Sequence, residues 1–422
     1  MRHPTVAVIG SGVSGLTAAY ALRSTHTVTV FEAEPRLGGH THTHDVTDPD
    51  GQHYPVDSGF IVHNDRTYPR LRALFAELGI EARPTEMSMS ITCHGCDMEY
   101  AGGRGAKGIL ARPRQLLRPR FVGMLAQVRH FHDDAKRFLD DSSAEDLTTL
   151  GDWLREYGYG EYFVRHYAVP LVSCVWSSGD AVALQYPARY LFTFLHHHGM
   201  LQLSDSPQWF TVVGGSSTYV TAIADALPDL RRGDPVVSIS RPLDGPVEVR
   251  TASDAVSVFD QVVIATHADQ ALALLADPTP EEKRILGAFE YSTNETVLHT
   301  DTSILPTARQ ARASWNYVMD HCTEPSAAAR VTYWMNRLQG HQSSKDYLVT
   351  LNATDHLEPG SVLKTMHYTH PAYTAASVAA QRELTSLFTS TTAYAGAHFG
   401  WGFHEDGCRS GYAAADWTIA TA

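Results

Sequence analysis

The chain has 422 residues, more than one simple core needs, and suggests two lobes, since roughly 150 residues per domain is usual. Its 43% hydrophobic and 19% charged residues are typical of a globular protein and argue against disorder. The formal charge is −13, from 33 basic and 46 acidic residues, so the surface repels nucleic acid and no nucleic-acid partner is expected.

The sequence also bears on location. Its five Cys are an odd number scattered along the chain, so a reducing cytoplasm fits better than a disulfide framework. No signal peptide is expected, because a strand-like run begins at Thr5. No stretch approaches the ~18 apolar residues of a transmembrane helix. We therefore expect a cytoplasmic protein that is not an integral membrane protein.

The first 32 residues predict a β-α-β unit. An apolar strand at Thr5–Ile9 is followed by a glycine loop, a helix at residues 16–22 and a β-branched strand at residues 27–31 that ends in Glu32. The loop has the pattern Gly-x-Gly-x-x-Gly, and the residues assigned to it are Gly10, Gly12, Val13, Ser14 and Gly15.

Glycines at this spacing suit a bound dinucleotide. The first permits a tight turn, the second lets the backbone approach a pyrophosphate, and the third lets the helix pack on the strand. The helix N-terminus then presents N–H groups and a partial positive charge to the phosphates. Glu32, followed by Ala33, ends the second strand, where a carboxylate accepts the hydroxyls of the adenosine ribose.

In the rest of the chain, segments with an α/β pattern alternate with segments that are mainly helical or mainly strand-like. Residues 86–206 are helical, irregularly amphipathic and rich in aromatic residues and His, and residues 211–275 return to α/β texture. Strand-like segments dominate residues 281–373, and residues 391–415 are α/β again. The elements expected after residue 206 include a helix at 219–227 and strands at 236–239, 261–266, 296–300, 331–335 and 347–351.

These textures predict an α/β fold in two parts. A Rossmann-type cofactor domain would be assembled from three segments, residues 1–85, 207–278 and 388–422. An α+β substrate domain would combine a helical insertion at residues 86–206 with an antiparallel sheet at residues 279–387.

The continuation of the first unit resembles the signature of the flavin amine oxidase and protoporphyrinogen oxidase family of FAD enzymes. That signature is an acid, then Arg-x-Gly-Gly-Arg and a nearby Thr. The paired glycines let a second loop close over the pyrophosphate. His40 stands where the family usually has its second Arg, and an imidazole offers a phosphate less fixed positive charge than a guanidinium does. The matching residues are Glu32, Arg36, Gly38, Gly39, His40 and Thr41.

Later segments resemble the same family in order. Residues 56–60 resemble a loop near the flavin ring, residues 234–239 a strand that meets the adenine, and residues 262–266 the return strand of the cofactor domain. Residues 402–411 resemble a helix N-terminus that stabilises negative charge on the flavin pyrimidine. The FAD contacts that this implies are Ser58, Gly59, Phe60, Val236, Gly396, Phe403, His404 and Glu405.

The sequence is also similar to a bacterial subgroup of predicted NAD/FAD-binding proteins, often encoded beside cyclopropane-fatty-acid-synthase-like enzymes. The marks are residues 38–43, 57–62, 209–216 and 402–407. This resemblance implies a lipid-like or otherwise apolar substrate.

Two features bear on the reaction. Amine oxidases of this family use a Lys that holds a water against the flavin. The corresponding strand here, residues 294–299, lacks Lys, and Lys364 is the only Lys on a later strand of the predicted substrate domain. Phe403 matches one of the two aromatic rings that flank the flavin, and is assigned to the substrate pocket. His398 and His404 are the catalytic candidates, since imidazole moves protons near neutral pH, the alternative being that they only make hydrogen bonds.

We expect no metal site. His40, His42 and His44 alternate but lack Cys or carboxylate partners at ligand spacing. Cys93 and Cys96 form a C-x-x-C without a second pair, which favours a plain turn over a zinc or redox site.

Two further segments leave alternatives open. Residues 196–198 are three His that either end a helix or line the substrate cavity. Residues 107–129 interleave Arg with apolar residues and form either a solvated helix face or a peripheral membrane contact.

The combined expectation is an enzyme with non-covalent FAD, an oxidase or desaturase that moves a hydride from a C–H bond of an apolar substrate, such as an acyl chain or polyene, to flavin N5. The alternatives are a flavin-dependent double-bond isomerase without net redox change, an amine oxidase, and a non-catalytic flavin-binding partner. The sequence leaves the electron acceptor, the catalytic base and the oligomeric state open.

Overall fold

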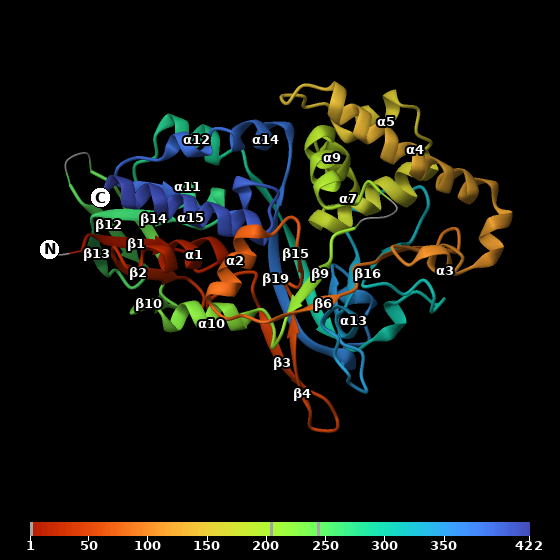
Figure 1. The fold of residues 1–422 in the computed structure, drawn as a ribbon, viewed down its shortest axis with the longest axis horizontal. Helices are drawn as coiled ribbons and strands as arrows, with labels where there is room; N and C mark the ends of the chain where they lie inside the picture. The colour runs from red at the N-terminus through yellow and green to blue at the C-terminus, as the bar shows by residue number, and fades with distance from the viewer. Residues whose placement is uncertain (1–2, 203–205, 243–244) are drawn as a thin grey trace.

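The computed structural model describes residues 3–202, 206–242 and 245–422. A parallel sheet covered by helices forms the left half of Figure 1, and a larger mixed sheet with a group of helices forms the right half. The predicted α/β fold class is confirmed. Within the described ranges no helix has the length and apolar content to span a membrane.

The parallel sheet has five strands in the order β10-β2-β1-β14-β20. Its strands come from each of the three segments predicted for the cofactor domain, although the exact domain division stays a prediction. The bounds are β1 (Thr5–Ile9), β2 (Thr27–Glu32), β10 (Asp229–Arg232), β14 (Gln261–Ile264) and β20 (Thr392–Tyr394).

Both faces of this sheet are covered, as is usual for parallel strands. Because side chains alternate along a strand, Val6 and Val8 of β1 pack on one face, and Ala7 and Ile9 pack on the other. The first face is covered by α1 (Val13–Leu22), α2 (Pro69–Glu77), α10 (Ser217–Asp225) and α15 (His404–Thr421).

The second face is covered by helices and a small antiparallel sheet. The helices are α11 (Ala268–Leu274), α12 (Pro280–Leu286) and α14 (Ala375–Gln381), and the strands are β11 (Val236–Ser240), β12 (Val247–Thr251) and β13 (Val256–Phe259).

The larger sheet has seven strands in the order β19-β15-β18-β17-β16-β7-β8. Neighbouring strands run antiparallel, as predicted for residues 279–387, except that β16 and β7 are parallel. Two strands, β7 and β8, come from residues 86–206, which were expected to form a helical insertion. The bounds are β7 (Met89–Cys93), β8 (Met98–Gly102), β15 (Glu290–His299), β16 (Trp315–Met319), β17 (Val331–Trp334), β18 (Leu348–Leu351) and β19 (Val362–Ala372).

A group of helices with an aromatic core packs beside this sheet (Figure 1). Phe131, Trp153 and Phe192 lie at its centre, and ring centroids of Trp153 and Phe192 are 4.7 Å apart. The helices are α4 (Pro119–Asp141), α5 (Leu150–Glu156), α6 (Glu161–Phe163), a π-helical turn η2 (Val164–Ala168), α7 (Val169–Trp176), α8 (Asp180–Gln185) and α9 (Ala188–His197). The short helix α3 (Gly105–Ile109) packs on β8 instead.

Two small sheets and one helix lie beside the seven-stranded sheet, and β3 and β4 protrude at the bottom of Figure 1. Asp57, which ends β4, is fully buried and accepts hydrogen bonds from Thr43, Ser216 and Gln339, so it ties three distant segments together. The elements are β3 (Thr43–Thr47), β4 (His53–Asp57), β5 (His63–Asn64), β6 (Ala82–Thr85), β9 (Trp209–Val212) and α13 (Met335–Gln339).

Candidate functional site

The glycine loop joins β1 to α1 at the carboxyl edge of the parallel sheet. Gly10 has a φ of +99°, and its N–H donates to the Phe31 carbonyl over 2.8 Å. A Cβ at Gly15 would lie 1.9 Å from the Gly10 carbonyl oxygen, so a larger residue would push strand and helix apart. Gly12 is the N-cap of α1 and supplies no side-chain cap. The first N–H groups of α1 are therefore suited to a phosphate.

Glu32 lies beside this loop. Its Oε2 accepts from both the backbone N–H, over 2.9 Å, and the hydroxyl of Ser11, and its Oε1 accepts from the Glu34 N–H over 2.9 Å. A carboxylate offers about four acceptor positions, so at least one remains for a ribose hydroxyl. Ala33 follows in an exposed position. Ser11, which the sequence analysis did not single out, connects the carboxylate to the loop.

The second glycine pair lies directly on the first loop. Gly38 and Gly39 have φ values of +108° and +55°. The Gly38 N–H donates to the Ser11 carbonyl over 3.0 Å, and a Cβ at Gly39 would lie 3.3 Å from Gly12 Cα. The arrangement fits a pyrophosphate enclosed between two stretches of backbone, as the family resemblance implied.

The segment at residues 58–60 packs against residue 40. The Phe60 N–H donates to the His40 carbonyl over 2.9 Å, and a Cβ at Gly59 would lie 2.0 Å from that same oxygen. The Ser58 hydroxyl lies 2.7 Å from the Tyr368 hydroxyl on β19. These contacts connect the cofactor loops to the seven-stranded sheet.

The last helix, α15, crosses α1 at two glycines. A Cβ at Gly407 would lie 2.6 Å from a Val13 methyl, and one at Gly411 would lie 2.4 Å from the Ser14 carbonyl oxygen. This close packing sets the start of α15, capped by Phe403, near the start of α1. Two helix N-termini therefore face the same region and together favour negative charge there.

Side chains at the start of α15 are already engaged. His404 Nε2 lies 3.0 Å from the Thr41 hydroxyl, and its ring stacks on Phe60 with centroids 3.8 Å apart. The Glu405 carboxylate accepts the backbone N–H groups of Arg70 and Leu71, at 3.0 and 2.9 Å, and so caps α2. The Glu405 side chain is therefore held toward the start of α2.

Neutral histidines gather at the same edge. The ring centroid of His40 lies 5.4 Å from that of His370 and 6.1 Å from that of His267. Burial, reinforced by neighbouring imidazoles, lowers the pKa of His40 and His267 to about 4 and that of His370 and His398 to about 3. Burial also holds the pKa of His404 well below its ordinary value. These rings are uncharged near neutral pH, which favours hydrogen bonding over proton transfer for the two catalytic candidates.

His398 also tests whether the site suits a polar cofactor. It follows β20 at the carboxyl edge, just after Gly396, and its Nε2 is buried without a hydrogen-bond partner among the described residues. A buried polar atom without a partner is costly, so a ligand group that bonds it would stabilise this arrangement. Val236, the residue predicted to meet the adenine, is half-buried at the start of β11.

A cavity of about 580 Å³, called the α15 cavity, opens beside the start of α15. Its aromatic wall includes Trp401 and Phe403, and Phe403 stacks on Phe194 with centroids 4.9 Å apart. Its residues are Arg66, Thr67, Tyr68, Pro69, Arg70, His196, His197, His198, Trp401, Phe403, Glu405, Asp406 and Arg409.

Residues 196–198 lie at the end of α9 and also line this cavity, and its use by a substrate stays a prediction. His198 is held at both ring nitrogens, by the Phe194 carbonyl at 2.9 Å and the Thr67 hydroxyl at 3.0 Å.

Lys is absent from the residues that line this cavity in the described part of the chain. On β15, Asn294 is buried and bonds His370 and Asn352. Lys364 lies opposite Leu298 on β19 and is exposed. His267 and His370 were missed by the sequence analysis. The position of His267 just after β14, at the carboxyl edge of the sheet, was the available signal.

Comparisons with known proteins agree with this geometry. A model of the flavin containing amine oxidoreductase family matches residues 13–306. Coproporphyrinogen III oxidase from Mycobacterium tuberculosis is 41% identical over 90 residues, which cover 20% of this chain and only 18% of that protein.

Two solved structures are similar over almost the whole chain. Cyclohexylamine oxidase from Brevibacterium oxydans IH-35A has a TM-score of 0.70 at 19% identity and 99% coverage of both chains. A CLA-producing fatty acid isomerase from P. acnes has a TM-score of 0.63 at 15% identity and 97% coverage of both. At these identities the likeness establishes the fold alone. The family match extends over most of the chain and includes the helix that begins at the glycine loop, so this chain belongs to the flavin containing amine oxidoreductase family and is a flavin-dependent oxidoreductase.

Proposed function

We propose that the chain binds FAD without a covalent link and desaturates an apolar acyl or polyene substrate. A hydride would pass from one C–H bond to the flavin, a proton would leave the neighbouring carbon to solvent, and dioxygen or another acceptor would reoxidise the flavin. The adenine dinucleotide is favoured over FMN because Glu32 and the glycine loop suit a ribose and a pyrophosphate. A thiol linkage is disfavoured because Cys408 is fully buried within α15. Denaturation should release FAD into solution, whereas flavin fluorescence that stays with the chain on a denaturing gel would contradict the non-covalent mode.

The observation that carries the substrate class is the chemistry of the cavity. Its wall is aromatic, and three arginines (Arg66, Arg70 and Arg409) are exposed at its edge. Of the two acids there, Asp406 is paired with Arg409 at 3.1 Å, and Glu405 caps α2. Such a cavity suits a molecule with an apolar body and a carboxylate head, and opposes an alkylammonium ion.

Burial of apolar surface would supply most of the binding free energy for such a substrate. Each 100 Å² of apolar surface removed from water contributes about 2.5 kcal/mol. Trp401 and Phe403 line the cavity and would exclude water from a substrate bound beside the start of α15. When bound, flavin would supply an acceptor for the hydride at N5, and the N–H groups at the start of α15 would stabilise the negative charge of the reduced ring.

Two features weaken the amine oxidase alternative. The strand expected to provide a water-holding Lys has Asn294 in a buried network instead. The cavity edge carries more basic than acidic side chains. An isomerase is the second candidate, supported by the fatty acid isomerase that shares the fold. Net consumption of an electron acceptor separates oxidation from isomerisation.

The deciding experiment is anaerobic mixing of the flavin-loaded protein with alkyl amines, fatty acids and polyenes, followed by absorbance. We expect acyl or polyene compounds to bleach the flavin, and amines to have no effect. Arg70→Gln should weaken binding of a fatty acid but not of its methyl ester, whereas Arg155→Gln, an exposed control on α5, should change neither. If only alkyl amines bleached the flavin rapidly, the protein would be an amine oxidase and the proposed substrate class would be wrong.

The proposal includes a peripheral contact with an anionic membrane through residues 107–129. Large apolar side chains on this segment face solvent, and Leu117 is 84% exposed. Arg114 and Arg120 are exposed among them, so the surface combines apolar and positive groups as interfacial segments do. The other exposed apolar side chains are Leu110, Leu116 and Val122.

A further inference from the structure

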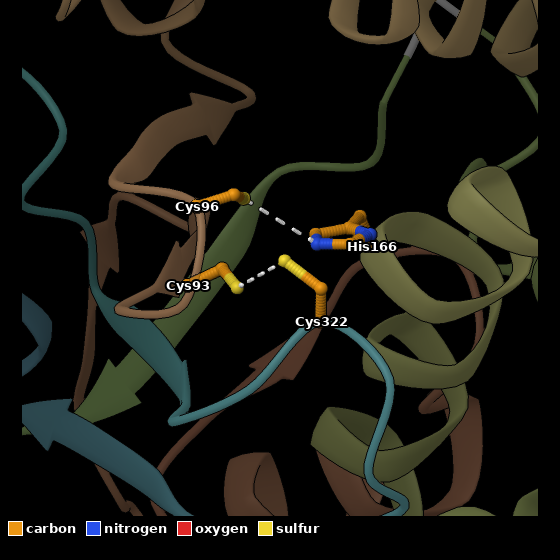
Figure 2. A group of neighbouring side chains, drawn as sticks. All are labelled: Cys93, Cys96, His166 and Cys322. Atoms are coloured by element: carbon orange, nitrogen blue, oxygen red, sulfur yellow. Dashed lines mark hydrogen bonds between the residues drawn. The ribbon is translucent and has the colours of Figure 1, made fainter.

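Three cysteines and one histidine from distant parts of the chain meet beside the seven-stranded sheet (Figure 2). Cys93 and Cys96 belong to the turn between β7 and β8, His166 to the π-helical turn η2, and Cys322 to the loop after β16. Their sulfur and ring nitrogen atoms all lie within 4.8 Å of one another. Cys93 and His166 are fully buried, and Cys96 and Cys322 are half-buried.

The sheet register brings the cysteines together. β16 runs parallel to β7 with Met319 opposite Cys93, so the chain reaches Cys322 just beyond the same end of the sheet. The two loops touch at Gly95, where an added Cβ would lie 3.0 Å from the Cys322 backbone nitrogen. The glycine therefore lets Cys322 approach the C-x-x-C turn.

The histidine is oriented as a ligand. Its Nδ1 lies 2.9 Å from the Tyr162 carbonyl, which fixes the proton on that nitrogen and leaves the Nε2 lone pair facing the sulfurs. Its ring stacks on Tyr162 with centroids 3.9 Å apart, and its backbone carbonyl accepts from the Tyr100 hydroxyl over 2.8 Å. A metal-bound His usually has its second nitrogen held in this way. The local π-helical turn is also a feature found often at functional sites.

The spacing suits a tetrahedral zinc ion. With Zn–S bonds of about 2.3 Å and a Zn–N bond of about 2.0 Å, ideal geometry gives S···S and S···N separations of about 3.8 and 3.5 Å. The Cys93 and Cys322 sulfurs are 3.6 Å apart, and the Cys96 sulfur is 3.7 Å from His166 Nε2. A disulfide would join only two of these groups and leave the remaining thiol and the imidazole without a role.

We propose that Cys93, Cys96, His166 and Cys322 bind one structural Zn²⁺ ion. Four protein ligands close the coordination sphere, which is typical of structural rather than catalytic zinc. Three thiolates and a neutral imidazole leave the occupied site with one negative charge. Arg118, which donates to the Cys96 carbonyl, is placed to offset that charge. Binding releases the protons of those thiols that are protonated beforehand.

The ion would fasten the helical group to the sheet. His166 belongs to the helices, whereas the cysteines belong to loops at one end of β7 and β16. None of the four lines the α15 cavity, so zinc binding should affect folding of this part rather than the flavin reaction directly.

The first test is metal analysis of the full chain, purified with a reductant and without chelators. We expect about one zinc ion per chain. Zinc-free protein should take up one equivalent of added Zn²⁺, and Co²⁺ should give thiolate charge-transfer and tetrahedral bands beyond the flavin absorption. Reduced protein that neither contains zinc nor takes up Zn²⁺ would overturn the proposal, as would stoichiometric iron or a disulfide among these cysteines under reductant.

A matched pair of variants tests the ligand assignment. Cys322→Ser should lower zinc content at least about tenfold and the thermal midpoint with it, because one ligand is lost. Cys174→Ser also changes a buried thiol, but outside the cluster, and should keep its zinc. If Cys322→Ser fails to fold, wild-type protein decides: a chelator should remove its zinc and lower its midpoint, and added Zn²⁺ should restore both. Zinc retained in full by folded Cys322→Ser contradicts the assignment.

Discussion

Replacing Glu32 with alanine should weaken FAD binding and loosen the loop that receives it. The carboxylate accepts from the Ser11 N–H and hydroxyl and from the Glu34 N–H, and the variant leaves these three donors without it. Because Glu32 is half-buried, water compensates for part of this loss. A charge-assisted hydrogen bond contributes about 1.5–3 kcal/mol, so losing the ribose contact alone should raise the Kd for FAD roughly 10- to 150-fold.

The assay titrates flavin-free protein with FAD, and the same samples give thermal midpoints with and without the cofactor. Glu32→Gln provides the matched control, because it keeps an acceptor for Ser11 but loses the charge, so its Kd should lie between those of wild type and Glu32→Ala. The rise in thermal midpoint that added FAD produces should be smaller in the variants that bind FAD more weakly. An unchanged Kd in Glu32→Ala would refute the role of the carboxylate at the ribose, whatever happens to stability.

Three further perturbations test other parts of the structure. Gly411→Ala should destabilise the protein by about 1–3 kcal/mol and reduce flavin content, because the added methyl group would meet the Ser14 carbonyl. In the control Gly123→Ala, on α4, the methyl group meets nothing, so this variant should be neutral or stabilising. Equal changes in the free energy of unfolding would contradict the close packing of α15 on α1. Burial raises the pKa of Asp57 from 3.8 to about 6, so its contribution to stability falls as the pH rises between these values and then levels off. The stability of wild type relative to Asp57→Asn, measured by denaturant unfolding, should fall over the same interval, and a constant difference would refute the shift. Leu117→Asp should reduce sedimentation with anionic vesicles, with Val258→Asp as an exposed control on β13, and equal binding by all three proteins would exclude the proposed membrane contact.

Local sequence patterns were enough to predict the cofactor elements. β1 was expected with its exact bounds, and the following helix and strand differ by a few residues at their ends. These elements are determined by apolar runs and glycines that are close in sequence, and their backbone conformations have few alternatives. The family-like segment at residues 262–266 likewise predicted the position of β14. No strand was predicted at β10, and the strand expected at residues 236–239 joins the small antiparallel sheet as β11.

Contacts between distant segments could not be predicted in this way. Cys93 and Cys322 meet because of the parallel register of β16 and β7, and no local pattern specifies that register. The Glu405 side chain caps α2, whose residues Arg70 and Leu71 lie more than 300 positions earlier in the chain, and its expected flavin contact stays a prediction. The proposed proton-transfer role of His398 depended on its unperturbed pKa, and burial changes that value.

The order of strands in the parallel sheet has a consequence for synthesis of the protein. β1 occupies the centre, yet its neighbour β14 is made some 250 residues later, and β20 and α15 later still. At roughly 5–20 residues per second, the apolar faces of β1 and α1 stay without their final partners for tens of seconds on the ribosome. Contacts so distant in sequence also slow folding. The nascent chain should therefore depend on chaperones, and flavin should enter only after residues 404–421 have emerged and α15 has packed on α1.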